Sequence, residues 1–208
     1  MHKFLFLLFA LFIIHTLNAQ YKLVSNTTAF TAAFTEASAK TNSIVSNFTQ
    51  VKTLALLSEK LSSKGKFYFQ KNDKVRMEYT SPFQYLMIIN GSKVFIKDGE
   101  KTNTLNSKSN KMFQQINQLM MDCMSGNIFG NKNFSVRLFE DADNYLAEMT
   151  PQTGQLKSMF KKVNVILKKS NYIVSQVQMF EPGGDYTSLN YTNQQINTRL
   201  SDALFSVK

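Results

Sequence analysis

Alternation of apolar and polar residues with a period of two dominates the chain beyond its first forty residues, and this pattern is typical of half-buried β-strands. It predicts strands over residues 46–51, 65–70, 75–79, 86–89, 94–96, 102–105, 134–139, 145–149, 159–167, 172–180 and 186–191, with a last short strand at 204–207. The dipeptides Asn90-Gly91 and Asp98-Gly99 lie between such runs and favour tight hairpin turns. Consecutive hairpins of this kind predict a curved antiparallel sheet or a partly closed barrel.

Two segments instead repeat their apolar residues at spacings of three and four, which is typical of amphipathic helices. The first covers residues 26–40, where Ser25 or Asn26 can act as the N-cap. The second runs through Met112, Phe113, Ile116, Leu119, Met120, Cys123 and Met124. We therefore predict a mainly β protein with two or more helices (α+β), built around a curved antiparallel β-sheet or a partly closed barrel.

Two short helices are too few to cover one whole face of so large a sheet tightly. The second helix is rich in methionine, whose unbranched side chain repacks easily around varied apolar partners. The strand pattern turns Phe67, Phe69, Val75, Met77 and Tyr79 inward. Two interpretations stay open at this point: a sheet that cups an apolar ligand beneath a helical lid, or an ordinary core between sheet and helices.

The first residues have the layout of a secretory signal peptide. A basic start over residues 1–3 precedes an unbroken apolar run over 4–14, and Ala19 supplies a small residue at the expected cleavage point. The run is well short of the roughly 20 residues that a membrane-spanning helix needs. We expect cleavage of residues 1–19, export to the periplasm, and a single domain over residues 20–208.

Histidine is nearly absent from the chain. Its 208 residues contain two histidines, His2 and His15, and both lie in the predicted signal peptide. The exported domain then lacks the imidazole of Ser-His-Asp or Cys-His catalysis and of histidine metal sites. Neither a phosphate-binding glycine loop nor a G-x-S-x-G or H-E-x-x-H motif occurs. We expect no enzyme, no metal and no cofactor, although a lysine or carboxylate mechanism stays open.

The remaining chemical groups point to structural roles. Glu140, Asp141 and Asp143 lie between two predicted strands and are interpreted as a solvated hairpin tip. Cys123 has apolar neighbours and is interpreted as an inert buried thiol. The net charge of +10 suits attraction to anionic lipids or an acidic partner, or simply a surface made soluble by lysine. Export argues against a nucleic acid as partner.

Short motifs follow one another in a recognisable order between residues 48 and 98. They are Phe48-Thr49-Gln50, then Gly65 with Phe67 and Phe69, then Val75-Arg76-Met77-Glu78-Tyr79 ending three residues before Pro82, and finally Asn90-Gly91 followed by Val94-Phe95. With one predicted helix before them and another after them, these motifs resemble the LolA family of periplasmic lipoprotein carriers. The resemblance spans essentially the whole exported chain.

This resemblance implies an open, strongly curved antiparallel β-sheet or incomplete β-barrel with a helical lid over an apolar cavity. It also implies a monomeric carrier that takes lipoproteins from the inner to the outer membrane. The implied partners are acylated lipoproteins, an inner-membrane ABC complex that releases them, and an acceptor at the outer membrane. The strand residues expected to line the cavity are Phe48, Phe67, Phe69, Val75, Met77, Tyr79, Val94, Ile96, Val136, Leu138, Val163 and Val165. The expected lid residues are Met112, Phe113, Ile116, Leu119, Met120 and Met124.

One position departs from the family pattern. The family typically carries an arginine after the strand that opens with the glycine, where it holds the lid shut. Here that position is Lys71, which keeps the charge but loses the planar five-donor fork, so the resemblance implies a weaker latch. Arg76 is expected on the opposite face. Two alternatives stay open: a periplasmic domain that senses envelope stress through lipid or a partner, and a carrier of another lipid or glycolipid.

Overall fold

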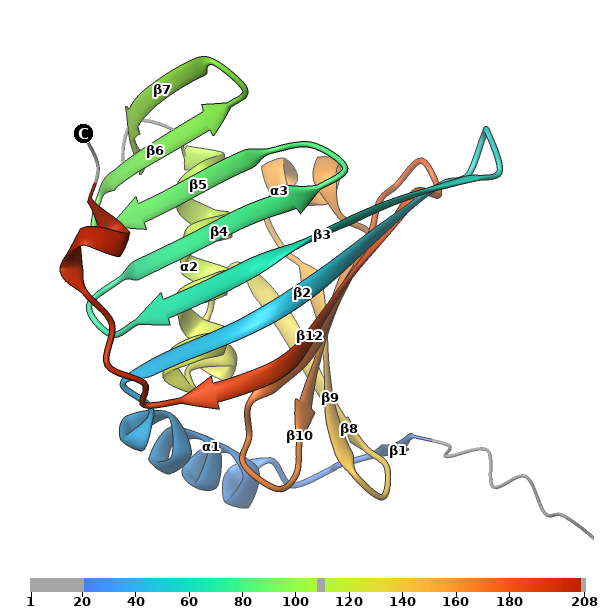
Figure 1. Cartoon of the computed structure of the whole chain (residues 1–208). Helices are drawn as coiled ribbons and strands as arrows, with labels where there is room; N and C mark the ends of the chain where they lie inside the picture. Colours follow the sequence, from blue (N-terminus) through green and yellow to red (C-terminus); the bar gives the residue numbers. More distant parts are fainter. Residues whose placement is uncertain (1–20, 108–110, 207–208) are drawn as a thin grey trace, which may run out of the picture.

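The computed structural model describes residues 21–107 and 111–206, apart from the side chains of residues 112 and 113. The predicted signal peptide, residues 1–19, lies outside these ranges. Within them, one large antiparallel sheet curls around a helix, and further helices close its ends (Figure 1). The predicted fold class, an open curved sheet with helices packed on it, is confirmed.

A twelve-stranded sheet forms the wall of the molecule. Its strands are β1 (Lys22–Leu23), β2 (Ser43–Leu54), β3 (Glu59–Gln70), β4 (Lys74–Ser81), β5 (Tyr85–Asn90), β6 (Lys93–Asp98), β7 (Lys101–Asn106), β8 (Phe134–Glu140), β9 (Asn144–Pro151), β10 (Lys162–Lys168), β11 (Val174–Phe180) and β12 (Tyr186–Ile196). Their spatial order is β1-β8-β9-β10-β11-β12-β2-β3-β4-β5-β6-β7. In the described part of the chain the edge strands β1 and β7 do not pair with each other, so the barrel stays open.

Gly65 allows two strands and an aromatic ring to come close together on the inner face. It pairs with Phe48 across the β2–β3 hairpin and with Tyr79 across β3 and β4. A Cβ atom at this position would overlap the carbonyl oxygen of Glu78 and lie 2.7 Å from Cζ of Phe48. Glycine therefore makes room for the Phe48 ring, which packs edge-on against Tyr79 with 4.9 Å between ring centroids.

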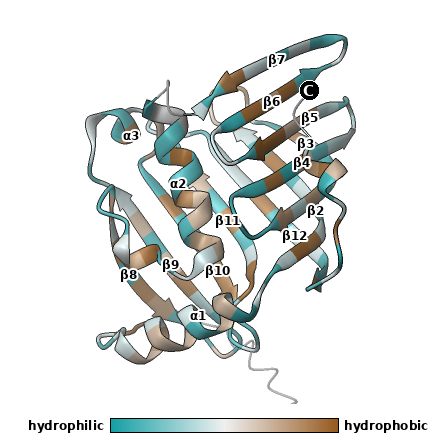
Figure 2. Ribbon diagram, turned by 90° about the vertical axis from the view of Figure 1, so that its left-hand side faces the viewer, coloured by the Kyte–Doolittle hydropathy of each residue, from teal (hydrophilic) through white to brown (hydrophobic). Residues whose placement is uncertain are grey.

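Helices cover the concave face and the ends of the sheet. In the described residues they are α1 (Thr28–Lys40), α2 (Lys111–Ser125) and α3 (Gly154–Met159), with two 3-10 turns, η2 (Ile128–Gly130) and η3 (Asp202–Phe205). Helix α2 lies across the concave face, between β8–β10 on one side and β3–β6 on the other (Figure 2). No helix among the described residues is long and apolar enough to span a membrane.

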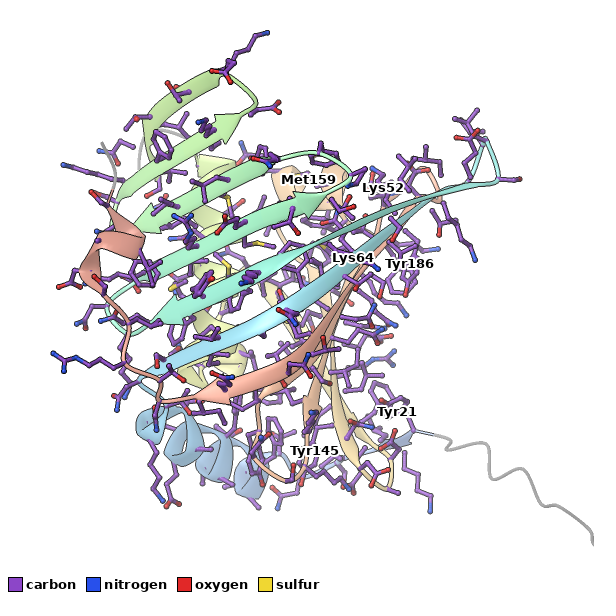
Figure 3. All side chains as sticks on the ribbon, viewed as in Figure 1. Tyr21, Lys52, Lys64, Tyr145, Met159 and Tyr186 are labelled. Atoms are coloured by element: carbon purple, nitrogen blue, oxygen red, sulfur yellow. The ribbon has the colours of Figure 1, made fainter. Side chains whose placement is uncertain are left out.

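Helix α1 closes one end of the curled sheet through aromatic contacts. Phe30 and Phe34 are buried, and the Phe30 ring lies 4.7 Å from that of Tyr145 in β9. Tyr145 is found beside this helix in Figure 3. The helix begins at Thr28, close to its predicted start, but the predicted N-cap at Ser25 or Asn26 is wrong: Thr27 is the N-cap and its side chain makes no capping hydrogen bond. Asn26 instead shapes the turn before the helix, because its Oδ1 accepts a hydrogen bond from the backbone nitrogen of Thr28 at 3.0 Å.

The buried apolar residues form two clusters that meet beneath α2. One cluster lies among α1, α3 and strands β8–β11 and contains Leu138 and Val163. The other lies on strands β2–β6 and contains Phe67. Met124 of α2 and Tyr191 of β12 pack against both clusters, so α2 joins the two halves of the inner face.

Two predicted strands begin too early. The strand predicted over 159–167 is wrong at its start because Met159 ends α3, and β10 begins at Lys162. A helix of six residues is too short to show a helical period in the sequence. The strand predicted over 172–180 begins at Val174, because Tyr172 has a left-handed φ of 59° and forms part of the turn.

The last predicted strand, at 204–207, is also wrong. Leu204 and Phe205 end η3, which lies against the outer face of β4 and β5 (Figure 1), Ser206 follows this turn as its C-cap, and residue 207 lies outside the described residues. Phe205 is fully buried there, and its carbonyl oxygen accepts a hydrogen bond from Nδ2 of Asn90 at 3.1 Å. The apolar residues of this segment therefore anchor the C-terminal part of the chain to the sheet without extending it.

Candidate apolar binding site

An apolar cavity of about 190 Å³ lies between α2 and the concave face of the sheet. Helix α2 contributes Ile116, Asn117, Leu119, Met120, Cys123 and Met124, and the sheet contributes Met77, Met87, Ile89, Val163, Val165, Val174, Val177, Met179, Leu189 and Tyr191. None of these lining side chains is an acid, a lysine or an arginine. The surroundings therefore suit an uncharged aliphatic group.

The spacing of residues in α2 decides which of its faces meets the cavity. Ile116, Leu119, Met120 and Cys123 stand at positions i, i+3, i+4 and i+7, which form one stripe on an α-helix. Gln114, which lies off this stripe, is exposed to solvent. The helix therefore meets the sheet through an apolar surface, as the sequence period predicts, with Gln114 and Gln118 exposed to solvent and Gln115 and Asp122 buried.

The opposite wall of the cavity is a ladder of apolar residues from strands that are distant in sequence. Met77 of β4 pairs with Met87 of β5, and Val177 of β11 pairs with both Val165 of β10 and Leu189 of β12. Paired residues on neighbouring strands point to the same face of a sheet. The antiparallel register therefore brings these side chains together on the inner face.

Methionine is the most frequent residue in the lining, at positions 77, 87, 120, 124 and 179. Its unbranched and polarisable side chain adapts to ligands of different shape. The cavity of about 190 Å³ is smaller than the roughly 300–1,000 Å³ typical of small-molecule pockets. A long acyl chain therefore requires the methionines to repack or α2 to move away from the sheet.

The two titratable side chains in the lining, Cys123 and Tyr191, are both neutral at physiological pH. Burial raises the pKa of the Cys123 thiol to about 12, and the neighbouring carboxylate of Asp122 contributes to the same shift. Burial also raises the pKa of Tyr191 well above its usual range. The prediction that Cys123 is a buried thiol is confirmed, and neither group supplies an anionic nucleophile at neutral pH.

The structure brings seven of the predicted site residues together at the cavity. They are Met77, Val163 and Val165 from the sheet and Ile116, Leu119, Met120 and Met124 from α2. The other predicted lining residues lie in the surrounding core: Phe48, Phe67, Phe69, Val75, Tyr79, Val94 and Ile96 on the β2–β6 side, and Val136 and Leu138 on the α1 side. The side chains of Met112 and Phe113 lie outside the description. Contact of any of these residues with a lipid stays a prediction.

Several lining residues escaped the sequence reasoning. They are Met87, Ile89, Asn117, Cys123, Val174, Val177, Met179, Leu189 and Tyr191. In β5 the unbroken apolar run over 86–89 carries no alternation, so its inward face cannot be read from the period. In β11 and β12 the pairs Val177/Met179 and Leu189/Tyr191 do keep the period of two, and this signal could have found them.

Lys71 follows directly after β3 and binds α1. Its Nζ donates a hydrogen bond to the carbonyl oxygen of Ala39 at 2.5 Å. Arg76 lies on the outer face, as predicted, where its guanidinium pairs with the carboxylate of Glu78 at 3.0 Å. The contact of Lys71 therefore ties α1 to the sheet, and a latch between Lys71 and α2 stays a prediction.

The acidic segment between β8 and β9 forms the predicted hairpin tip. Oδ1 of Asp141 accepts hydrogen bonds from the backbone nitrogens of Asp143 at 2.8 Å and of Asn144 at 2.6 Å. Its carboxylate therefore shapes the turn. Across the described residues, no group of three or more histidine, cysteine or acidic side chains is placed to hold a metal ion.

Comparison with known proteins gives one family match. The sequence model of the family described as "Outer membrane lipoprotein carrier protein LolA" matches residues 39–208. No curated protein matches the chain in sequence.

Solved structures share the fold at low sequence identity. An uncharacterized conserved protein from Thermus thermophilus has a TM-score of 0.53 at 9% identity, with 86% of this chain and 93% of that chain covered. A chain of the Pseudomonas aeruginosa MucA/MucB complex has a TM-score of 0.52 at 10% identity, with 86% and 60% covered. A LolA superfamily protein from Nitrosomonas europaea has a TM-score of 0.45 at 12% identity, with 85% and 97% covered. At these identities the likeness concerns the fold alone.

Proposed function

Because this chain belongs to the LolA family, we propose that it carries acylated lipoproteins from the inner to the outer membrane and shields their acyl chains beneath α2. The observation that carries the proposal is the uncharged, methionine-rich lining of the cavity between α2 and an open sheet. The proposal includes removal of residues 1–19 and a periplasmic location for residues 20–208. It involves no enzymatic step.

The energetics of an acyl chain in water support a shielded cavity. Each exposed methylene costs ~0.8 kcal/mol, so ten of them cost ~8 kcal/mol. An apolar lining can offset this cost because it leaves none of its own charges buried against the chain. Burial of the chain between α2 and the sheet would therefore keep the lipoprotein soluble between two membranes.

Release requires that α2 can leave the sheet again. Near its start, Nε2 of Gln115 donates hydrogen bonds to Asn133 at 3.3 Å and to Thr153 at 3.4 Å. Near its end, Asp122 accepts a hydrogen bond from Asn131 at 2.7 Å. Between these polar anchors the helix rests on apolar side chains, which repack at low cost. This arrangement supports a helix that moves over the cavity while its ends stay attached.

The proposal is tested with purified residues 20–208 in two assays. Mass spectrometry of extracted lipid reports bound ligand, and inner-membrane vesicles that contain a lipoprotein and its ABC release complex report transfer upon addition of ATP. Met120→Glu puts a carboxylate into the cavity, whereas the control variant Gln114→Glu puts the same group on the exposed side of α2. We expect the wild type and the control to bind and release lipoprotein, and the cavity variant to lose both activities.

Two results would contradict this expectation. The carrier proposal fails if the wild type neither contains lipid nor releases lipoprotein. The cavity assignment fails if Met120→Glu remains folded and releases as much lipoprotein as Gln114→Glu does.

A second candidate function is a periplasmic domain that senses lipid or a protein partner. The fold that the chain shares with a chain of the MucA/MucB complex, at a TM-score of 0.52, favours this candidate because that chain was solved bound to a protein partner. Lipid bound to the wild type without any release of lipoprotein from the vesicles would favour sensing over transport.

A further inference from the structure

A second pocket, of about 480 Å³, adjoins the apolar cavity near the C-terminal ends of α1 and α2. It is lined by Thr35, Ser38 and Ala39 of α1, by Phe69, Lys71, Asn72 and Asp73 at the β3–β4 turn, and by Asn117, Gln118, Met121, Asp122, Met124, Ser125 and Asn127 of α2 and the segment after it. Figure 1 shows these three elements converging at the same end of the curled sheet. In contrast to the apolar cavity, most residues of this pocket are polar.

Two residues of α2 line both spaces. Asn117 and Met124 border the polar pocket and the apolar cavity alike, and they lie two helical turns apart on one side of α2. The polar and apolar spaces therefore share a wall. A ligand that fills both would therefore place its polar end and its aliphatic chain along the same side of α2.

Asn117 presents an unpaired polar group at this shared wall. Its Oδ1 atom is buried and has no hydrogen-bond partner in the described structure. A buried amide oxygen is unfavourable without a donor. Because the atom is buried, the side-chain amide must first rotate toward the pocket, after which an amide N–H of a ligand can pair with the oxygen or the NH₂ group can donate to a ligand carbonyl.

Lys71 supplies donors on the facing wall. Its ammonium carries three N–H groups and donates one of them to the carbonyl oxygen of Ala39, so two can point to a ligand in the pocket. The two other charged lining residues, Asp73 and Asp122, are acidic. Asp122 is buried, and its oxygens accept hydrogen bonds from Gln118 at 2.8 Å and Asn131 at 2.7 Å. One ammonium beside two carboxylates favours neutral carbonyl groups over a phosphate.

We propose that this polar pocket binds the amide and ester linkage of an acylated lipopeptide, with Asn117 paired to its amide and Lys71 to its carbonyl oxygens, while the acyl chain enters the apolar cavity. The proposal rests on the proposed carrier function and adds to it the part of the cargo that the protein recognises. A phospholipid carries the same ester carbonyls, but it lacks the amide and adds a phosphate. The pocket therefore distinguishes a lipoprotein from the bulk lipid of the membrane.

The test measures the affinity of three probes by fluorescence or competition: a synthetic triacylated lipopeptide, phosphatidylglycerol, and the hydrocarbon fluorophore diphenylhexatriene, which has no polar group. Asn117→Leu and Lys71→Met remove the polar ends and keep the side-chain size. Lys132→Met, at an exposed lysine outside both pockets, is the matched control. Thermal unfolding checks that all variants are folded.

We expect each pocket variant to bind the lipopeptide roughly 3- to 10-fold more weakly and diphenylhexatriene as well as the control does. A weaker affinity of Lys71→Met for phosphatidylglycerol as well would identify the ester carbonyls as the ligand of Lys71 and support the pocket. An equal loss of phosphatidylglycerol binding in Asn117→Leu would show that Asn117 does not recognise the amide and would overturn the proposal. Equal loss for diphenylhexatriene would show that Lys71 or Asn117 acts on the cavity as a whole and would overturn the proposal. Unchanged lipopeptide binding would also overturn it. A wild type that binds none of the probes would instead refute the carrier function itself.

Discussion

Replacement of Gly65 by alanine tests whether close contact at one backbone position holds the inner face together. The new Cβ would overlap the Glu78 carbonyl oxygen and lie 2.7 Å from Cζ of Phe48. A backbone oxygen cannot rotate away, so β3 and β4 must separate at this point, and the buried Phe48 ring must shift as well. Overpacking of this kind costs about 3 kcal/mol in the free energy of unfolding. In a domain of this size that cost lowers the thermal midpoint by about 6–12 °C.

Circular dichroism during heating and urea titration measure this difference. Gly183→Ala, in the turn between β11 and β12, is the matched control, because a Cβ there meets nothing within 4 Å. We expect the control to stay within about 0.5 kcal/mol of the wild type. If Gly65→Ala unfolds at the same temperature as Gly183→Ala, the close contact at Gly65 is not a constraint on the fold, and the reasoning is refuted.

Three further predictions concern charge, reactivity and the C-terminal segment. Hydrogen bonding to Lys162 lowers the pKa of the Glu148 carboxyl. The stability that this ion pair contributes is therefore present above the pKa that Glu148 has in the unfolded chain, and it is lost as the pH falls through the lower pKa of the folded protein. Glu148→Gln should cost about 1 kcal/mol in the free energy of unfolding at pH 7 and nothing near pH 2, as measured by urea titration. Because burial raises the pKa of Cys123 to about 12, iodoacetamide should label it on the order of 100-fold more slowly in the folded than in the unfolded protein. Equal rates would show that α2 does not hold this thiol buried against the sheet. Phe205→Ala should lower the free energy of unfolding by about 3–4 kcal/mol because the ring is fully buried. Phe83→Ala, at a half-exposed ring, should lower it by less than about 1 kcal/mol. Equal losses of stability would show that η3 does not anchor the chain.

Local sequence signals predicted the elements that depend on neighbouring residues. Gly91 and Gly99 form the turns that join β5, β6 and β7, as expected, because their left-handed φ of 58° and 57° suits tight hairpins, while Asn90 and Asp98 end the preceding strands. The spacing of apolar residues predicted α2 in nearly its full length. Helix α3 and η3 were missed because each is shorter than the window over which a period can be recognised.

The residues that line the cavity show where local signals end. Phe67 and Met77 are paired across β3 and β4 and share the inner face, as their alternation predicts. Met77 borders the cavity, whereas Phe67 fills the core beside it and packs on Tyr191 with 5.3 Å between ring centroids. Alternation decides the face of the sheet on which a residue lies, but not whether α2 passes over that residue.

The sequence by itself determined the open antiparallel sheet, the two longer helices and, through the motifs between residues 48 and 98, the family. Hydrophobic period, turn chemistry and motif order are properties of neighbouring residues, and for that reason they can be read without a structure. Tertiary structure decided that β10, β11 and β12 complete the cavity wall, that Lys71 binds α1, and that Asn117 stands between an apolar and a polar space. These facts depend on how far the sheet curls and where α2 rests on it, and such long-range contacts have no local period in the chain.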